Sequence, residues 1–102
     1  MRVYIAGKMT GLEDKGRKAF QKAELQLKAL GHVVLNPAIL PDGLLSHQYM
    51  PICLAMLEQA EAIYLLDNWR DSPGAKLELE YARYQHKLIR AQEDGGFEYT
   101  YI

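Results

Sequence analysis

The chain has 102 residues, of which 49% are hydrophobic and 25% charged, and its formal net charge is −1. A chain of this length can bury roughly 60–68% of its unfolded surface around one core, so we expect a single domain with its core at about residues 2–91 and a tail at 92–102. The composition excludes extensive disorder and a membrane span, and the balanced charge argues against polymeric nucleic acid as a ligand. A small anionic ligand remains compatible with this charge, because one or two cations or a helix N-terminus can hold a phosphate.

Cys53 is the only cysteine, so an internal disulfide is excluded. The histidines are scattered, and no Cys/His cluster has the spacing of zinc ligands, so we expect neither a metal nor a cofactor. The N-terminal apolar run is too short for a secretory leader, and a reducing cytoplasmic location fits both features.

The first half of the chain predicts strand, helix and strand. Residues 3–6 form a short apolar run that ends at Gly7 and predicts the first strand. Thr10 and Glu13 have capping-box spacing, and apolar residues then recur with helical period as far as Gly31, which predicts a helix over about 12–30. The run at 32–35, closed by an Asn-Pro pair, predicts a second strand followed by a longer loop with a turn at 41–43.

The second half repeats the alternation. Apolar residues between 49 and 60 recur at i, i+3, i+4, i+7, i+8 and i+11, which predicts a second helix, and residues 62–66 form the apolar run expected of a central strand. Ser72, Pro73 and Gly74 have the pattern of a helix start, which predicts a third helix to about residue 86, and residues 88–91 predict a fourth strand. For the tail, an edge strand and a flexible or partner-docked segment both stay open.

This order predicts a single-domain, three-layer α/β fold of the Rossmann-like or flavodoxin-like kind, with a parallel sheet of four to five strands and helices on both faces. Ligands of such sheets bind at the carboxyl ends of the strands, where the strand order reverses. We therefore expect residues 7–11, 36–47 and 67–74 to line one crevice, where Asp67 and Glu78 meet.

Two carboxylates at this edge are candidates for chemistry. Glu78 lies about 60° from the centre of the inward stripe of the third helix, whereas Glu80 points almost the opposite way. The structural alternatives are an acid favoured by the helix dipole for Glu78 and a loop cap for Asp67. Two carboxylates facing one crevice suit chemistry at the anomeric carbon of a sugar, where one serves as nucleophile.

Three segments together resemble the nucleoside 2-deoxyribosyltransferase superfamily, most of all its short bacterial and phage members. They are Tyr4-Ile5-Ala6-Gly7, Tyr64-Leu65-Leu66-Asp67-Asn68-Trp69, and Asp71 to Glu78 with Tyr81-Ala82. The resemblance covers about residues 3–90 and implies cleavage of an N-glycosidic bond or transfer of a deoxyribosyl group. It implies that Glu78 attacks C1′, that Asp67 contacts the substrate and that Tyr4 orients the nucleophile.

The resemblance also implies residues that bind the substrate, a nucleoside or nucleotide. Related monophosphate hydrolases hold the 5′-phosphate with the first loop and the start of the third helix, and Trp69 has a ring on which a base can stack. The candidates are Gly7, Lys8, Thr10, Trp69, Ser72 and Gly74. The alternatives are a turn glycine for Gly7, a solvated loop lysine for Lys8 and a packing or interface role for Trp69.

Two departures from the family pattern keep other functions open. Pro73 interrupts the Asp-Ser-Gly sequence that precedes the helix in the transferases, and residues 98–102 have no counterpart of the residue that a neighbouring subunit contributes there. A protein that binds or sequesters a nucleotide without turnover is therefore the main alternative, and an interaction module that uses Trp69 and the aromatic tail is a third. A homo-oligomer is expected in either leading case. Cys53, Met50 and Met56 fit core positions on a helix stripe.

Overall fold

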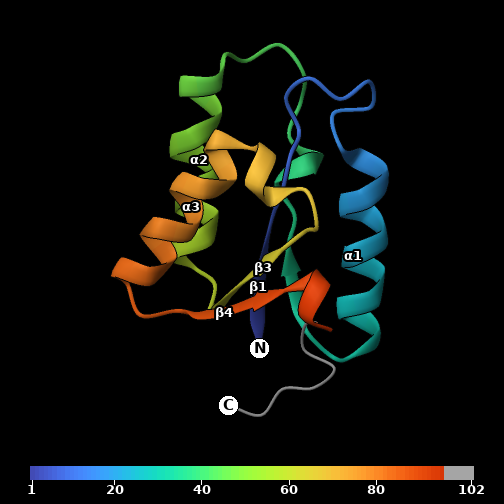
Figure 1. Cartoon of the computed structure of the whole chain (residues 1–102), viewed down its shortest axis with the longest axis vertical. Helices are drawn as coiled ribbons and strands as arrows, with labels where there is room; N and C mark the ends of the chain where they lie inside the picture. Colours follow the sequence, from blue (N-terminus) through green and yellow to red (C-terminus); the bar gives the residue numbers. More distant parts are fainter. Residues whose placement is uncertain (96–102) are drawn as a thin grey trace.

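The computed structural model describes residues 1–95, in which four strands and three α-helices alternate (Figure 1). Their bounds are β1 Arg2–Ala6, α1 Arg17–Ala29, β2 Val33–Leu35, α2 Ser46–Glu58, β3 Ala62–Leu65, α3 Pro73–Tyr84 and β4 Leu88–Ala91. Three short 3-10 helices follow strands: η1 Pro37–Ile39, η2 Trp69–Asp71 and η3 Gln92–Asp94. The alternation predicted from periodicity and from the Gly and Pro positions is confirmed. The strand considered for the aromatic tail falls at residues 96–102, outside the described residues.

All four strands are parallel, in the order β2-β1-β3-β4. The chain moves from β1 to β2 at one edge and then returns past β1 to form β3 on its other side. The strand order therefore reverses between β1 and β3, where Tyr4 is paired with Ile63. Because ligand crevices of open α/β sheets form at this point, the topology places the predicted site at the carboxyl ends of β1 and β3.

Helices cover both faces of the sheet, which confirms the predicted three-layer α/β fold. Figure 1 shows α1 on one side of the strands and α2 with α3 on the other. On the α1 side, Val3 and Ile5 pack with the buried Phe20 and Leu27. The core on the side of α2 and α3 contains Tyr4, Ala6, Cys53, Leu57, Ala60, Ile63, Leu65, Ala75, Leu79 and Ala82. Alternate residues of β1 thus serve different layers, as expected for a strand buried on both faces.

The start of α1 differs from the prediction. The helix begins at Arg17, and the predicted capping box of Thr10 and Glu13 lies in a turn before it. Lys15 and Gly16 both have positive φ angles, of 58° and 78°, which interrupts any helix that begins earlier. The carboxylate of Asp14 accepts hydrogen bonds from the amides of Gly16 and Lys18, at 2.9 and 3.1 Å, and satisfies the amides at this end.

The start of α3 agrees with the prediction. Ser72 is the N-cap, and its Oγ accepts a hydrogen bond of 3.1 Å from the amide of Ala75. Pro73 follows at the first helical position. An N–H at this position has no acceptor within the helix, so its absence in proline costs no helical hydrogen bond. Within residues 1–95, every helix is too short or too polar to span a membrane.

Candidate functional site

Glu78 is a buried carboxylate held by a hydrogen bond to a second buried residue. The hydroxyl of Tyr4, at the middle of β1, donates to Oε2 of Glu78 over 2.7 Å. Glu78 is 6% exposed and Tyr4 is inaccessible to solvent. Glu80, two positions along the same helix, is exposed and forms an ion pair with Arg83. The angular position of Glu78 on the helix predicted this difference.

Burial changes the acidity of both partners. Removal of the carboxylate from water raises the pKa of Glu78 to about 7, while hydrogen bonds from Tyr4 and Cys53 act in the opposite direction. Burial, and then the nearby Glu78 carboxylate, raise the pKa of Tyr4 far above its ordinary value, so the phenol remains a proton donor. Glu78 is therefore poised to change its charge near neutral pH, as nucleophiles and general acids in active sites do.

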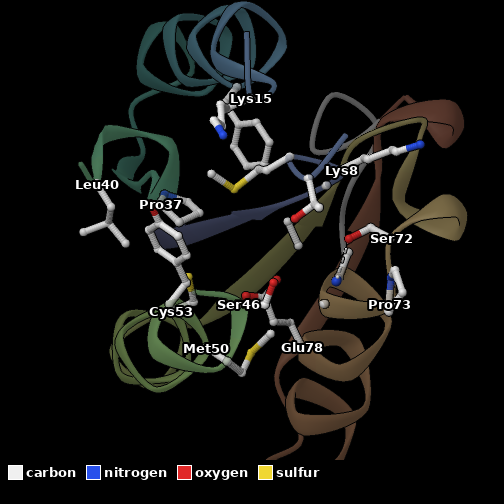
Figure 2. A pocket seen from close by; sticks show the side chains of 18 of the residues that line it. Lys8, Lys15, Pro37, Leu40, Ser46, Met50, Cys53, Ser72, Pro73 and Glu78 are labelled. Carbon is white, nitrogen blue, oxygen red and sulfur yellow. Dashed lines mark hydrogen bonds between the residues drawn. The ribbon is translucent and has the colours of Figure 1, made fainter. Parts of the chain in front are cut away.

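Glu78 and Tyr4 line a cavity of about 490 Å³ at the switch point of the sheet. Figure 2 shows Glu78 between residues of α2, among them Met50 and Cys53, and residues Ser72 and Pro73 before and at the start of α3. The lining comes from residues 4–11, 15, 17, 20, 37, 40, 42–46, 49, 50, 53, 71–75 and 78. Each of the three segments expected at the crevice thus contributes. Most of the lining is apolar, and a volume of several hundred cubic ångströms suits a small molecule.

The loop after β1 forms one wall through two close approaches. A Cβ atom at Gly7 would lie 2.8 to 3.0 Å from side-chain atoms of Leu66, so only glycine lets β1 end against the residue that follows β3. The next residue, Lys8, donates its amide to Oδ1 of Asn68 over 2.9 Å. This bond joins the loops that follow β1 and β3. In Figure 2 the Lys8 side chain points away from Glu78, whereas Lys15 lies across the cavity from it.

The start of α3 forms the wall nearest to Glu78. Ser72 and Gly74 both line the cavity, one to two helical turns before Glu78. The first turn of a helix carries amides without helical acceptors and a partial positive charge, which suits an anion. Thr10 also lines the cavity and is exposed. Of the predicted binding residues, Gly7, Lys8, Thr10, Ser72 and Gly74 therefore share one cavity with Glu78 and Tyr4.

The structure does not bring Asp67 and Trp69 into this cavity. Asp67 is exposed, and its backbone amide donates to Oε1 of Gln92 over 3.1 Å. Trp69 packs against the core on the side of α2 and α3, with the guanidinium of Arg70 4.7 Å from the centre of its ring. The prediction that Asp67 meets Glu78 in the crevice is therefore corrected. The acidic residue of this loop that lines the cavity with Glu78 is Asp71. The strand end was predicted correctly, but the direction of a side chain in the following loop depends on tertiary bonds.

Sequence reasoning missed several residues of the cavity. Cys53 belongs to the core, as its place on an apolar stripe predicted, and it also lines the cavity, which the stripe does not indicate. Arg17 and Asp42 also line the cavity, and Nη2 of Arg17 contacts Oδ1 of Asp42 over 2.7 Å. This ion pair joins α1 to the loop before α2, and no local pattern in the sequence indicates it. Among residues 1–95, no group of three or more His, Cys, Asp or Glu side chains could hold a metal ion.

The arrangement defines a class of protein: a small doubly wound α/β domain with a buried glutamate in the crevice at its switch point. The chain belongs to the family described as domain of unknown function DUF4406, whose model matches residues 1–91. Comparison with the curated proteins gave no match.

A solved structure shares the fold. The chain is similar to a 2-desoxiribosyltransferase from Leishmania mexicana, with a TM-score of 0.71 and 20% sequence identity over 88% of this chain and 62% of that chain. This chain therefore spans less than two thirds of the length of that protein. The resemblance to nucleoside 2-deoxyribosyltransferases is confirmed at the level of the fold.

Proposed function

We propose that this protein cleaves the N-glycosidic bond of a nucleoside or nucleotide, or transfers its deoxyribosyl group, with Glu78 as the nucleophile. The observation that carries this proposal is the buried Tyr4–Glu78 pair, whose 2.7 Å hydrogen bond holds the carboxylate in a cavity at the switch point. The transferase named in the comparison, which has the same fold, supports the choice of substrate class.

The reaction assigns a role to each member of the pair. An ionised carboxylate oxygen of Glu78 attacks C1′ of the sugar, a bond forms between them, and the C1′–N bond breaks. The nucleobase leaves with the electron pair of that bond and takes up a proton. Water or an acceptor base then attacks C1′ and releases Glu78. The hydroxyl of Tyr4 keeps one carboxylate oxygen in place, which leaves the other for attack.

The walls of the cavity provide contacts for the rest of the substrate. We assign hydroxyl or phosphate groups of the ligand to Thr10, Ser72 and the amides near Gly74, where helix α3 begins. Lys8 also lines the cavity, and because its side chain points away from Glu78 (Figure 2), we assign its positive charge to the end of the ligand remote from Glu78. Asp67 and Trp69 are candidates for contact with a part of the ligand that projects beyond the cavity, toward the loop after β3.

The test is release of free base from a panel of deoxynucleosides and their 5′-monophosphates. Wild type should release base from at least one of them, and Glu78→Ala should lower the rate by about a thousandfold or more, as expected when a covalent nucleophile is removed. Glu80→Ala is the matched control, because Glu80 lies on the same helix but is exposed, and it should retain the wild-type rate. Equal background rates for wild type and Glu78→Ala would end the enzyme proposal. The same assay on Asp67→Asn tests the contact beyond the cavity.

A second candidate is a protein that binds a nucleotide without turnover. It is favoured by the position of Asp67 outside the cavity and by Pro73 at the start of α3, where the transferases differ. Calorimetry would then give stoichiometric binding, and the ligand would be recovered intact. Recovery of free base from the same sample would exclude this candidate.

A further inference from the structure

Lys15 lines the cavity from an unusual backbone position. Its φ angle of 58° lies in the left-handed region, which is unfavourable for a residue with a Cβ atom. Hydrogen bonds on both sides fix this conformation: the amide of Lys15 donates to the carbonyl oxygen of Leu12 over 3.1 Å, and the amide of Gly16 donates to Oδ1 of Asp14 over 2.9 Å. Residues held in such conformations are common at sites that bind ligands. The backbone thus holds the root of the Lys15 side chain at the cavity.

The ammonium group of Lys15 is available to a ligand. Within residues 1–95 it forms neither a hydrogen bond nor an ion pair. The nearby cation Arg17 is already bonded to Oδ1 of Asp42 and to the carbonyl oxygen of Ala38. The hydrogen bond and charge of Arg17, and to a smaller extent the charge of Lys15, lower the pKa of Asp42, so the ammonium group lies near this ion pair without joining it. All three of its N–H donors remain for a bound molecule.

Lys15 and the start of α3 lie on different sides of the cavity. Figure 2 shows Lys15 across from Glu78 and on the side of Pro37, whereas Ser72 lies on the other side. The apolar side chains that α1, η1 and the loop before α2 contribute to the lining are Phe20, Pro37, Leu40, Leu44 and Leu45. Apolar walls suit a flat aromatic ring, and a single polar group among them fixes the orientation of that ring.

We propose that Lys15 determines base specificity: its ammonium group donates to the edge of the nucleobase and so favours 6-oxopurines over adenine. This inference rests on the proposed function, which places the sugar at Glu78, the phosphate toward α3 and hence the base toward Lys15. A 6-oxopurine offers two neighbouring acceptors, O6 and N7, whereas adenine presents the N6 amino donor beside N7. An ammonium group has donors only, so it pairs with both atoms of the first edge and is opposed by the amino group of the second.

The same contact assists departure of the base. When the C1′–N bond breaks, its electron pair passes to the ring, and part of the negative charge of an oxopurine moves onto O6. The ammonium group of Lys15 stabilises this charge and keeps its own proton, while the departing base takes up a proton from the solvent. The preference for the oxopurine should therefore be at least as large in kcat/KM for base release as in the binding of the free base.

The experiment measures the affinities of the whole chain for free hypoxanthine and free adenine, by titration of its backbone amide signals in NMR. The two bases differ at position 6, where hypoxanthine carries an oxygen and adenine an amino group. Wild type should bind hypoxanthine about tenfold more tightly, and Lys15→Met, which keeps the length of the side chain without its charge, should bind both bases within about twofold of each other. Lys15→Arg keeps the charge and should retain the preference.

Lys18→Met is the matched control, because Lys18 is exposed on α1 and does not line the cavity. This variant should bind both bases as wild type does. Equal affinities in wild type, a preference that survives in Lys15→Met, or no binding of either base would overturn the inference. Base release from 2′-deoxyinosine and 2′-deoxyadenosine with equal kcat/KM would also overturn it, although the proposed function would stand. A preference that depends on Lys15 without any base release would support the inference and exclude the proposed cleavage.

Discussion

Two glutamates on one helix illustrate how position decides chemistry at the scale of a residue. Glu80 is exposed and paired with Arg83, whereas Glu78 is buried and bonded to Tyr4. The helix angle predicted this contrast from the sequence, because it requires only the period of the helix and the apolar stripe. The neighbours of Glu78 come from β1 and α2, so their hydrogen bonds depend on tertiary packing and could not be predicted from local patterns.

Tyr4→Phe should move the pH dependence of the site. The substitution removes the donor to Oε2 and so raises the pKa of Glu78 above its value of about 7. The ionised nucleophile then becomes abundant only at higher pH. With a rise of about one unit, kcat/KM at pH 6 should fall about tenfold beyond any loss seen at pH 9.

The measurement is the pH profile of base release, together with an NMR titration of the Glu78 carboxyl group. Tyr81→Phe serves as control, since Tyr81 contributes its hydroxyl to bonds with Gln85 and Glu58 outside the cavity. An unchanged acid limb in Tyr4→Phe would show that the phenol does not influence the charge of Glu78.

At the scale of elements, helix and strand positions follow from sequence where periodicity meets a clear boundary. Ser72 and Pro73 mark the start of α3, and the Ser72 cap is formed as predicted. At α1 the helix begins only after Lys15 and Gly16, because both adopt the left-handed backbone conformation. A capping-box pattern in the sequence does not predict this conformation. The direction of Asp67 in its loop is likewise set by a contact with Gln92, 25 positions away.

Gly16→Ala should destabilise the protein more than Gly11→Ala. Both glycines have positive φ, of 78° and 88°, but a Cβ at Gly16 would lie 2.6 Å from the carbonyl oxygen of Lys8, whereas one at Gly11 meets nothing within 4 Å. The strained backbone alone costs about 1 kcal/mol, and the clash should at least double that cost at Gly16. Urea unfolding of both variants measures the difference. Equal losses of unfolding free energy in the two variants would show that the contact between a Cβ at position 16 and the carbonyl oxygen of Lys8 adds no cost.

For the whole molecule, burial of Glu78 places a cost on folding that depends on pH. The pKa of Glu78 is about 7 in the folded state, compared with the ordinary glutamate value of 4.5, which we take for the unfolded chain. Between these values the unfolded chain releases the proton and the folded chain retains it, so the free energy of unfolding falls as pH rises from about 4.5 to 7. Above about pH 7 the free energy of unfolding falls no further on account of Glu78, because the carboxyl group is then ionised in both states. This is the opposite of the behaviour of the ion-paired Glu24, whose pKa is lowered.

Glu78→Gln should therefore stabilise the protein at neutral and alkaline pH. The amide oxygen of glutamine can still accept from Tyr4, and no charge is buried. The gain should be near zero at pH 4 and rise to at most about 3 kcal/mol at pH 8. Denaturant unfolding at several pH values, with Glu80→Gln as control, measures it. A difference between variant and wild type that does not depend on pH would contradict the buried ionisation.

The bond between the Lys8 amide and the Asn68 side chain has a consequence for the size of the molecules that the cavity admits. It ties together the two loops on either side of the strand-order reversal. A ligand that leaves both loops in place keeps this bond, whereas one that separates them loses it, at a cost of about 1 kcal/mol. Other contacts being equal, the first kind of ligand is expected to bind about fivefold more tightly than the second.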